Sequence, residues 1–167
     1  MRVTIPMRLD PHDIGVAIRE IEGHKKELQR RLHLLTETLV LRGVETAKLY
    51  VKQMDANFTG LLESSIEGYY NPHLHAGWIM AGTPYAIFVE YGTGVVGEGT
   101  DPYAQELENA GWVYDINGHG EDGWTYYDAL TDTFRHTAGM AARPFMAMTA
   151  ETLYQRAEKI AQEVFGR

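Results

Sequence analysis

The sequence lacks several residue types and motifs on which common chemistries depend. It contains no cysteine, so neither disulfides nor thiolate metal sites are available. Its serines are Ser64 and Ser65 alone, and no G-x-S-x-G nucleophile motif occurs. The Gly-rich stretch 94–100 does not end in the Lys-Ser/Thr pair of a phosphate-binding loop. These absences leave little from which to build a catalytic site.

Long hydrophobic runs and an excess of positive charge are also missing. No apolar run approaches the ~20 residues needed to cross a bilayer. Lys and Arg number 15 against 23 Asp and Glu, which gives a formal net charge of −8. A broad surface that binds phosphates by counterion release is therefore not expected. With 167 residues, 44% of them hydrophobic, the chain 1–167 is expected to form one domain with its own core.

A long helix is predicted near the N-terminus. Asp10 is a suitable N-cap and Pro11 suits the first helical position, so the helix runs to about Met54 and could bend near Gly23 or Gly43. Core packing is the favoured explanation of its apolar stripe, and a coiled-coil contact with a neighbouring subunit is the alternative. The stripe has steps of three and four residues, with Lys25 in its one gap, and consists of Ile14, Ile18, Ile21, Leu28, Leu32, Leu35 and Leu39.

Short strands are predicted on either side of this helix. Residues 2–5 alternate polar and apolar and indicate one strand. Residues 65–70 and 75–81 predict an antiparallel hairpin, since Asn71-Pro72-His73 between them is typical of a tight turn.

The stretch 82–93, GTPYAIFVEYGT, is the one around which the rest of the chain is organised. Thr83 as a cap and Pro84 at the first position favour one to two helical turns, and Gly92 can supply the left-handed residue that ends them. A short buried strand is the competing interpretation, because the run is aromatic and β-branched. Glu90 is its one charged residue.

The remaining segments complete a predicted α+β fold. Residues 94–100 show no periodicity and predict a mobile loop, and Asp101 starts a short helix to about Asn109. Residues 112–115 and 124–127 predict paired aromatic strands, and Pro144 opens the last helix. We expect a mainly antiparallel sheet packed by the long N-terminal helix and the C-terminal helix, with the loop and aromatic hairpin inserted at about 94–140.

Histidines supply the strongest signal for a metal site, and it is weak. His73 and His75 form a His-x-His pair whose rings would share one face of a strand. No third ligand stands at suitable spacing, so a surface turn is the better interpretation. His136 could pair with an acid that the sequence does not identify. No metal and no other cofactor is expected.

Two short blocks resemble a known family. The block YAIFVEYGT (residues 85–93), the later Trp/Tyr segments and the block ARPF (residues 142–145) at the start of the last helix carry the resemblance. Together they resemble the tail-component proteins of long-tailed bacteriophages, also described as tail completion, neck or head–tail joining proteins. The N-terminal strand and long helix are also similar to that family's layout. Residues 95–111 make a longer connection than is usual there.

The resemblance implies a structural virion protein without catalytic residues. Such proteins form rings of identical subunits at the head–tail interface, between the head connector or adaptor and the tail tube or terminator proteins. DNA passes nearby without specific binding, and no membrane is involved. The expected location is the virion tail or neck, and the host cytoplasm during assembly.

Most residues of the two blocks are expected to maintain the fold, and some to contact partners. Arg143 is expected to pair with Glu90, and Phe88, Tyr91 and Phe145 to lie in the core. The full set is Tyr85, Phe88, Glu90, Tyr91, Gly92, Thr93, Arg143, Pro144 and Phe145. The expected assembly surface is aromatic and comprises Trp112, Tyr114, Trp124 and Tyr126.

Three alternatives stay open at this point. The nearest is a tail terminator. A second is a small acidic metal-dependent enzyme that uses His73, His75 or His136 with a carboxylate. A third is a monomeric host-directed binding protein whose aromatic hairpin is the recognition surface.

Overall fold

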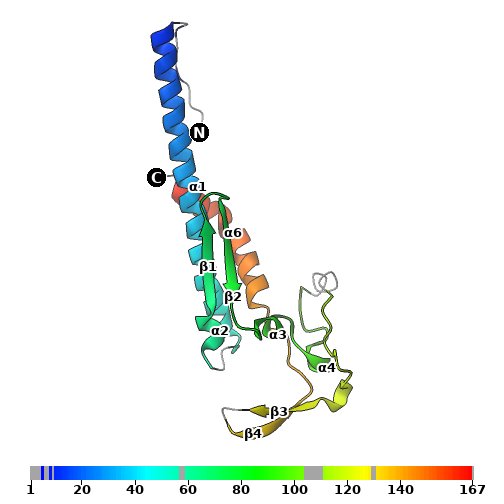
Figure 1. Cartoon of the computed structure of the whole chain (residues 1–167). Helices are drawn as coiled ribbons and strands as arrows, with labels where there is room; N and C mark the ends of the chain where they lie inside the picture. Colours follow the sequence, from blue (N-terminus) through cyan, green and yellow to red (C-terminus); the bar gives the residue numbers. More distant parts are fainter. Residues whose placement is uncertain are drawn as a thin grey trace.

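The computed structural model describes residues 10–56, 59–103, 111–128 and 131–166, together with Ile5 and Arg8. The fold is α+β: a long N-terminal helix and a C-terminal helix pack with two small antiparallel hairpins (Figure 1). The elements in chain order are α1 (Pro11–Gln53), α2 (Leu61–Ser64), β1 (Ile66–Asn71), β2 (Ala76–Ala81), α3 (Ala86–Tyr91), α4 (Gly94–Gly97), η1 (Gly120–Asp122), β3 (Trp124–Asp128), β4 (Thr133–Thr137) and α6 (Phe145–Phe165).

Helix α1 begins and ends as the sequence predicts. The Asp10 carboxylate accepts hydrogen bonds from the backbone N–H groups of His12 and Asp13 at 2.9 and 3.0 Å, and Pro11 is the first helical residue. These bonds satisfy donors that a helix N-terminus otherwise leaves free. The helix continues through both Gly23 and Gly43, and Met54 is its C-cap.

The first hairpin packs directly against α1. Strands β1 and β2 pair with Gly68 opposite Ile79 and Gly77 opposite Tyr70. A Cβ atom on Gly68 or Gly77 would lie 2.4 or 2.3 Å from a methyl carbon of Val40 on α1. The two glycines therefore let the hairpin approach the helix more closely than any other residue would.

Helix α6 packs on another side of α1 and closes the core. The hydroxyls of Tyr50 and Thr152 lie 2.8 Å apart, and Arg31 donates to the backbone carbonyl of Phe165 at 2.6 Å. The core lies where α1, α2, β1, α3 and the start of α6 meet. Its buried side chains belong to Ala47, Val51, Ala56, Leu62, Ile66, Ala86, Val89 and Phe145.

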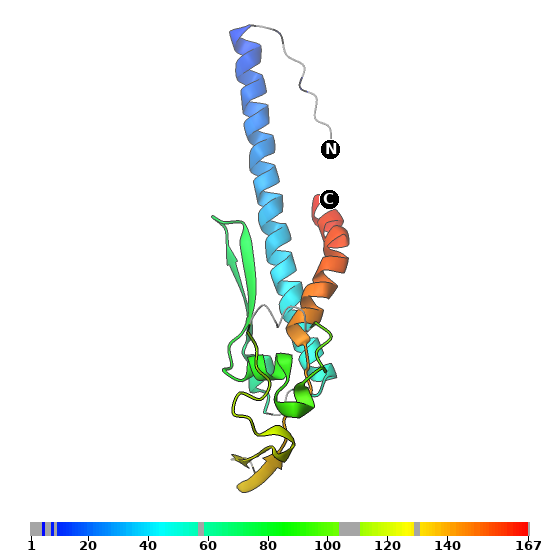
Figure 2. The same cartoon turned by 90° about the vertical axis from the view of Figure 1, so that its right-hand side faces the viewer.

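The second hairpin differs from the predicted one. Strand β3 pairs with β4, with Trp124 opposite Thr137 and Tyr126 opposite Arg135, so residues 124–127 do not pair with residues 112–115. Residues 112–115 form no strand. The two hairpins also stay separate, so there is no single sheet among the described residues. The β3–β4 hairpin lies at the opposite end of the molecule from the N-terminus of α1 (Figure 2).

Tertiary contacts explain why residues 112–115 leave the strand pattern. The Trp112 ring packs on the rings of Phe88 and Tyr91, with centroids 5.7 and 5.3 Å apart. The Tyr114 carbonyl accepts a 2.7 Å hydrogen bond from the N–H of Gly94. The Trp112 side chain and the Tyr114 carbonyl are thus held by α3 and Gly94, and residues 112–115 do not pair with residues 124–127.

The Gly-rich stretch 94–100 also differs from the expected irregular loop. Its first four residues form the helical turn α4, in which Gly94 and Gly97 are buried. The prediction of irregular structure is therefore wrong for α4. The predicted strand 2–5 (apart from Ile5) and most of the predicted helix 101–109 lie outside the described residues.

The two glycines inside α1 make a matched pair for a stability test. A Cβ at Gly23 would meet nothing within 4 Å, whereas a Cβ at Gly43 would lie 2.0 Å from Cδ1 of Ile79 and 3.0 Å from Cδ1 of Leu153. Gly23→Ala should therefore strengthen the helix by about 1 kcal/mol. In Gly43→Ala the same gain in helix propensity is opposed by overpacking against Ile79 and Leu153, which costs roughly 1–3 kcal/mol, so this variant should be less stable than Gly23→Ala.

Thermal unfolding followed by circular dichroism, with amide exchange across α1, measures both effects. We expect slower exchange around residue 23 in Gly23→Ala and a lower midpoint in Gly43→Ala than in Gly23→Ala. A midpoint in Gly43→Ala equal to or above that of Gly23→Ala would contradict the close packing of Ile79 on α1.

Candidate functional site

The two blocks that carry the family resemblance lie against each other. Val89, in α3, accepts a 2.8 Å hydrogen bond from the backbone N–H of Arg143. Thr93 and Met140 form an antiparallel bridge with two 2.9 Å backbone hydrogen bonds. Residues about 50 positions apart in the sequence are thereby held in one unit.

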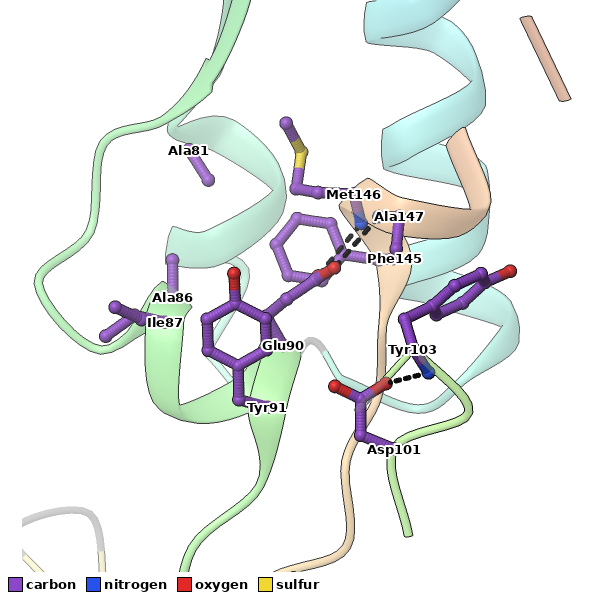
Figure 3. Close-up of a pocket in the computed structure, with 10 residues that line it drawn as sticks. All are labelled: Ala81, Ala86, Ile87, Glu90, Tyr91, Asp101, Tyr103, Phe145, Met146 and Ala147. Atoms are coloured by element: carbon purple, nitrogen blue, oxygen red, sulfur yellow. Dashed lines mark hydrogen bonds between the residues drawn. The ribbon is translucent and has the colours of Figure 1, made fainter. Parts of the chain in front are cut away.

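The side chain of Glu90 also links the blocks. Its side-chain oxygens accept hydrogen bonds from the backbone N–H groups of Met146 and Ala147, both at 2.9 Å. Helix α6 has Pro144 as its N-cap residue and no side-chain cap of its own. Glu90 therefore supplies, from α3, the acceptors that the first turn of α6 needs. Figure 3 shows its carboxylate pointing at the start of α6, beside the ring of Phe145.

The surroundings of Glu90 oppose its ionisation. The residue is 7% exposed, and burial raises the pKa of its carboxyl group. The neighbouring charge of Asp101 raises that pKa further, while the helix N–H groups act against both effects. Asp101 is also buried and accepts a 2.9 Å bond from the N–H of Tyr103. Both acids line a cavity of about 330 Å³ between α3 and α6.

The expected ion pair between Glu90 and Arg143 is wrong. Arg143 precedes the helix, so its backbone bonds to Val89, while the free N–H donors of α6 lie three and four residues further on. In the described structure no ion pair joins Arg143 to Glu90.

The core assignments for the aromatic residues are correct in part. Phe145 is fully buried, but Tyr91 is half-buried and Phe88 is 47% exposed. Phe88 belongs instead to an aromatic cluster with Trp112. The competing strand interpretation of this stretch is also settled, because α3 is a helix.

The predicted C-terminal end of α3 is correct, whereas the predicted N-terminal end is wrong. Gly92 ends the helix with a φ of +79°, as expected, and a Cβ there would lie 2.8 Å from the backbone N of Ala142 and from the carbonyl O of Met140. Thr83 is not the cap, because Tyr85 occupies that position and the buried Thr83 hydroxyl has no described hydrogen-bond partner.

An open aromatic cavity of about 830 Å³ lies beside the linked blocks. All four residues of the expected assembly surface line it, although their strand pairing was predicted wrongly. Three residues of the first block line it as well, so the cavity joins the signature to the aromatic segments. The relevant lining residues are Tyr85, Phe88, Thr93, Trp112, Tyr114, Trp124 and Tyr126.

Two polar groups in the cavity lining have no described hydrogen-bond partner. They are the indole N–H of Trp112 and the hydroxyl of Tyr114, both shielded from solvent. Burial raises the pKa of Tyr114, with smaller contributions from Asp101 and Glu98, so the hydroxyl keeps its proton. Unpaired buried donors are uncommon in proteins.

Asp115 shapes the turn that forms one wall of this cavity. Its carboxylate accepts the backbone N–H of His119 at 2.9 Å and that of Gly120 at 2.6 Å, and these bonds lower its pKa. The His119 ring then lies 5.4 Å from the ring of Trp124. Sequence reasoning missed this role of Asp115, because it placed the residue at the end of a predicted strand.

The histidines do not converge on a metal site. His73 and His75 lie in the turn between β1 and β2, and the His75 ring packs 4.8 Å from the ring of His33. His136 is on β4, with Nδ1 3.5 Å from the hydroxyl of Thr125. No group of three or more His, Asp or Glu side chains suited to a metal ion occurs among the described residues.

Among the described helices, none combines the length and apolar character needed to cross a membrane. Comparison with protein-family models, curated proteins and solved structures finds no match to this chain.

Replacing Glu90 by Ala tests the link between α3 and α6. It leaves two backbone donors of α6 without their acceptor, which should cost about 2 kcal/mol. The unfolding midpoint should fall by roughly 4–8 °C for a chain of this size. Glu163→Ala, an exposed acid on the same helix, is the matched control and should leave the midpoint unchanged. Equal midpoints for the two variants would show that Glu90 does not cap α6.

The raised pKa of Glu90 gives a pH dependence with a defined sign. A group whose folded pKa is raised stabilises the fold fully below its unfolded value, near 4.5, and loses that contribution as pH rises through the folded pKa. The stability of wild type relative to Glu90→Gln should therefore fall as pH rises above about 4.5. Urea unfolding of both proteins across this range measures the free energy of unfolding of wild type minus that of Glu90→Gln. An increase of this quantity with rising pH would contradict the expectation.

Proposed function

We propose that this chain is a structural subunit of a long-tailed phage virion, which joins or completes the tail at the head–tail interface as a ring of identical subunits. The family resemblance suggests this role. The observation that carries it is the amount of surface that the single chain leaves exposed.

The chain exposes far more area than a compact monomer of its mass. Its accessible surface is 11,878 Å² for 18.9 kDa, whereas monomeric proteins of that mass expose about 8,300 Å². The excess is comparable to the 2,000–5,000 Å² that permanent assemblies bury. A subunit of a permanent ring would bury such an excess against its neighbours.

The aromatic cavity supplies a suitable contact surface for that ring. Phe88, Tyr126 and Val113 around it are between 45% and 57% exposed. Large aromatic side chains in such recesses dominate the free energy of protein interfaces. The net charge of −8 also suits a ring that DNA passes without binding.

Particle assembly tests the role. Trp124→Ala should remove about 2 kcal/mol from each contact, roughly a 30-fold loss in affinity. In phage particles that lack the wild-type protein, complementation with Trp124→Ala should give few joined particles. Tyr154→Ala, which removes an aromatic ring 85% exposed on α6 and outside the cavity, is the matched control. Circular dichroism must first show that both variants fold.

The outcomes separate the competing roles. Heads that join tails normally without this protein would overturn the proposal. Tails of irregular length would favour a terminator. Normal yield with folded Trp124→Ala would exclude the cavity as the contact. A host-directed binding protein would be dispensable for particle formation altogether.

A further inference from the structure

The N-terminal half of α1 carries an apolar surface that the rest of the described chain does not cover. In both views this half extends past the β1–β2 hairpin and α6 (Figures 1 and 2). The C-terminal end of α6 meets α1 at Arg31, which donates to the Phe165 carbonyl. The exposed side chains before and at this point, which we call the α1 seam, are 37–57% exposed and comprise Ile14, Ile18, Ile21, Leu28 and Leu32.

The spacing of the seam is that of a coiled coil. Its members fall at alternating four- and three-residue steps, with Lys25 at the fourth of the six positions. The steps from position 14 to position 32 are 4, 3, 4, 3 and 4, so the pattern is the same read from either end. The seam is about 27 Å long. An unburied apolar strip of this size on a helix marks an interaction site.

We propose that the α1 seam binds the α1 seam of a second copy of this chain, with the two helices antiparallel. The symmetric spacing then sets Ile14 opposite Leu32 and Ile18 opposite Leu28. Each Lys25 lies opposite Ile21 of the second copy. This inference concerns the free protein and does not depend on the virion role.

Charge favours the antiparallel arrangement over the parallel one. A parallel pair would place Lys25 against Lys25 of the second copy inside the contact, and like charges there repel. In the antiparallel pair the two lysines separate. Glu22, which flanks Ile21, then lies beside Lys25 of the second copy, so each ammonium group gains a carboxylate neighbour.

The length of the free helix also matches this arrangement. The seam ends at Leu32, one residue past the point where α6 ends on α1. Two antiparallel seams therefore overlap along the free halves only, and the two folded bodies lie at opposite ends of the pair. The helix is already formed and capped, so association does not have to order it. A contact along this single strip covers less area than a standard interface, so the dimer should dissociate on dilution.

Sedimentation equilibrium of the full chain tests the dimer, over roughly 1 to 500 μM to bracket weak interfaces. Wild type should pass from monomer to dimer in this range. The double variant Ile18→Glu/Leu28→Glu buries charges in opposing layers and should weaken the dimer at least about 100-fold. Leu41→Glu/Leu49→Glu, which alters two exposed leucines of α1 outside the seam, is the matched control and should dimerise as wild type does.

Disulfide trapping tests the orientation, because the chain has no cysteine of its own. In the antiparallel pair, Ile18→Cys of one copy faces Leu28→Cys of the other, so a mixture of the two variants should cross-link far more than either variant alone. A monomeric wild type at every concentration, or an intact dimer in folded Ile18→Glu/Leu28→Glu, would overturn the proposal. Cross-linking of Ile18→Cys alone as efficient as that of the mixture would overturn the antiparallel arrangement.

Discussion

The carboxylate of Glu90 is the constraint on which the arrangement of this molecule depends. It comes from the six-residue helix α3 and accepts the N–H groups of Met146 and Ala147 at the start of the 21-residue helix α6. Pro144 has no N–H and offers no capping side chain, so α6 relies on an acceptor far away in the sequence. Because α6 also packs along α1, the position of Glu90 sets α3 relative to both long helices. It thereby sets the position of the aromatic cavity beside α3.

Burying Glu90 for this link has an energetic cost, which the start of α6 partly offsets. Burial and the neighbouring buried acid Asp101 disfavour the charged form of Glu90, and the positive end of the α6 dipole opposes both effects. The aromatic cavity lies beside the same unit, where the exposed Phe88 ring packs on Trp112. One short helix therefore serves the core with one face and an exposed recess with the other.

Local signals in the sequence predicted the elements better than the contacts between them. Asp10-Pro11 and the turn Asn71-Pro72-His73 specify their structures through neighbouring residues, so α1 and the first hairpin were predictable. Residues 112–115 carry the alternation of a strand but are held by Phe88, Tyr91 and Gly94, contacts that no local pattern reveals. The hydrogen-bond partners of Glu90 were missed for a related reason. A sequence shows an arginine that could pair with an acid, but it does not show which backbone N–H groups at a helix end need an acceptor. The four aromatic residues that the sequence grouped line one cavity, although the strand pairing predicted for them is wrong.

The excess surface of the chain is unevenly distributed, and this bears on how copies would meet. The α1 seam and the aromatic cavity lie towards opposite ends of an elongated molecule, separated by the core around Phe145. A seam with symmetric spacing suits a closed two-fold pair, in which both copies use the same surface. A recess is filled by a different surface of the neighbouring copy, so it suits head-to-tail contacts, which form rings when the rotation closes. The two surfaces can therefore act in different states of the same protein. A contact through one leaves the other free, so a dimer of the free chain need not compete with assembly through the cavity.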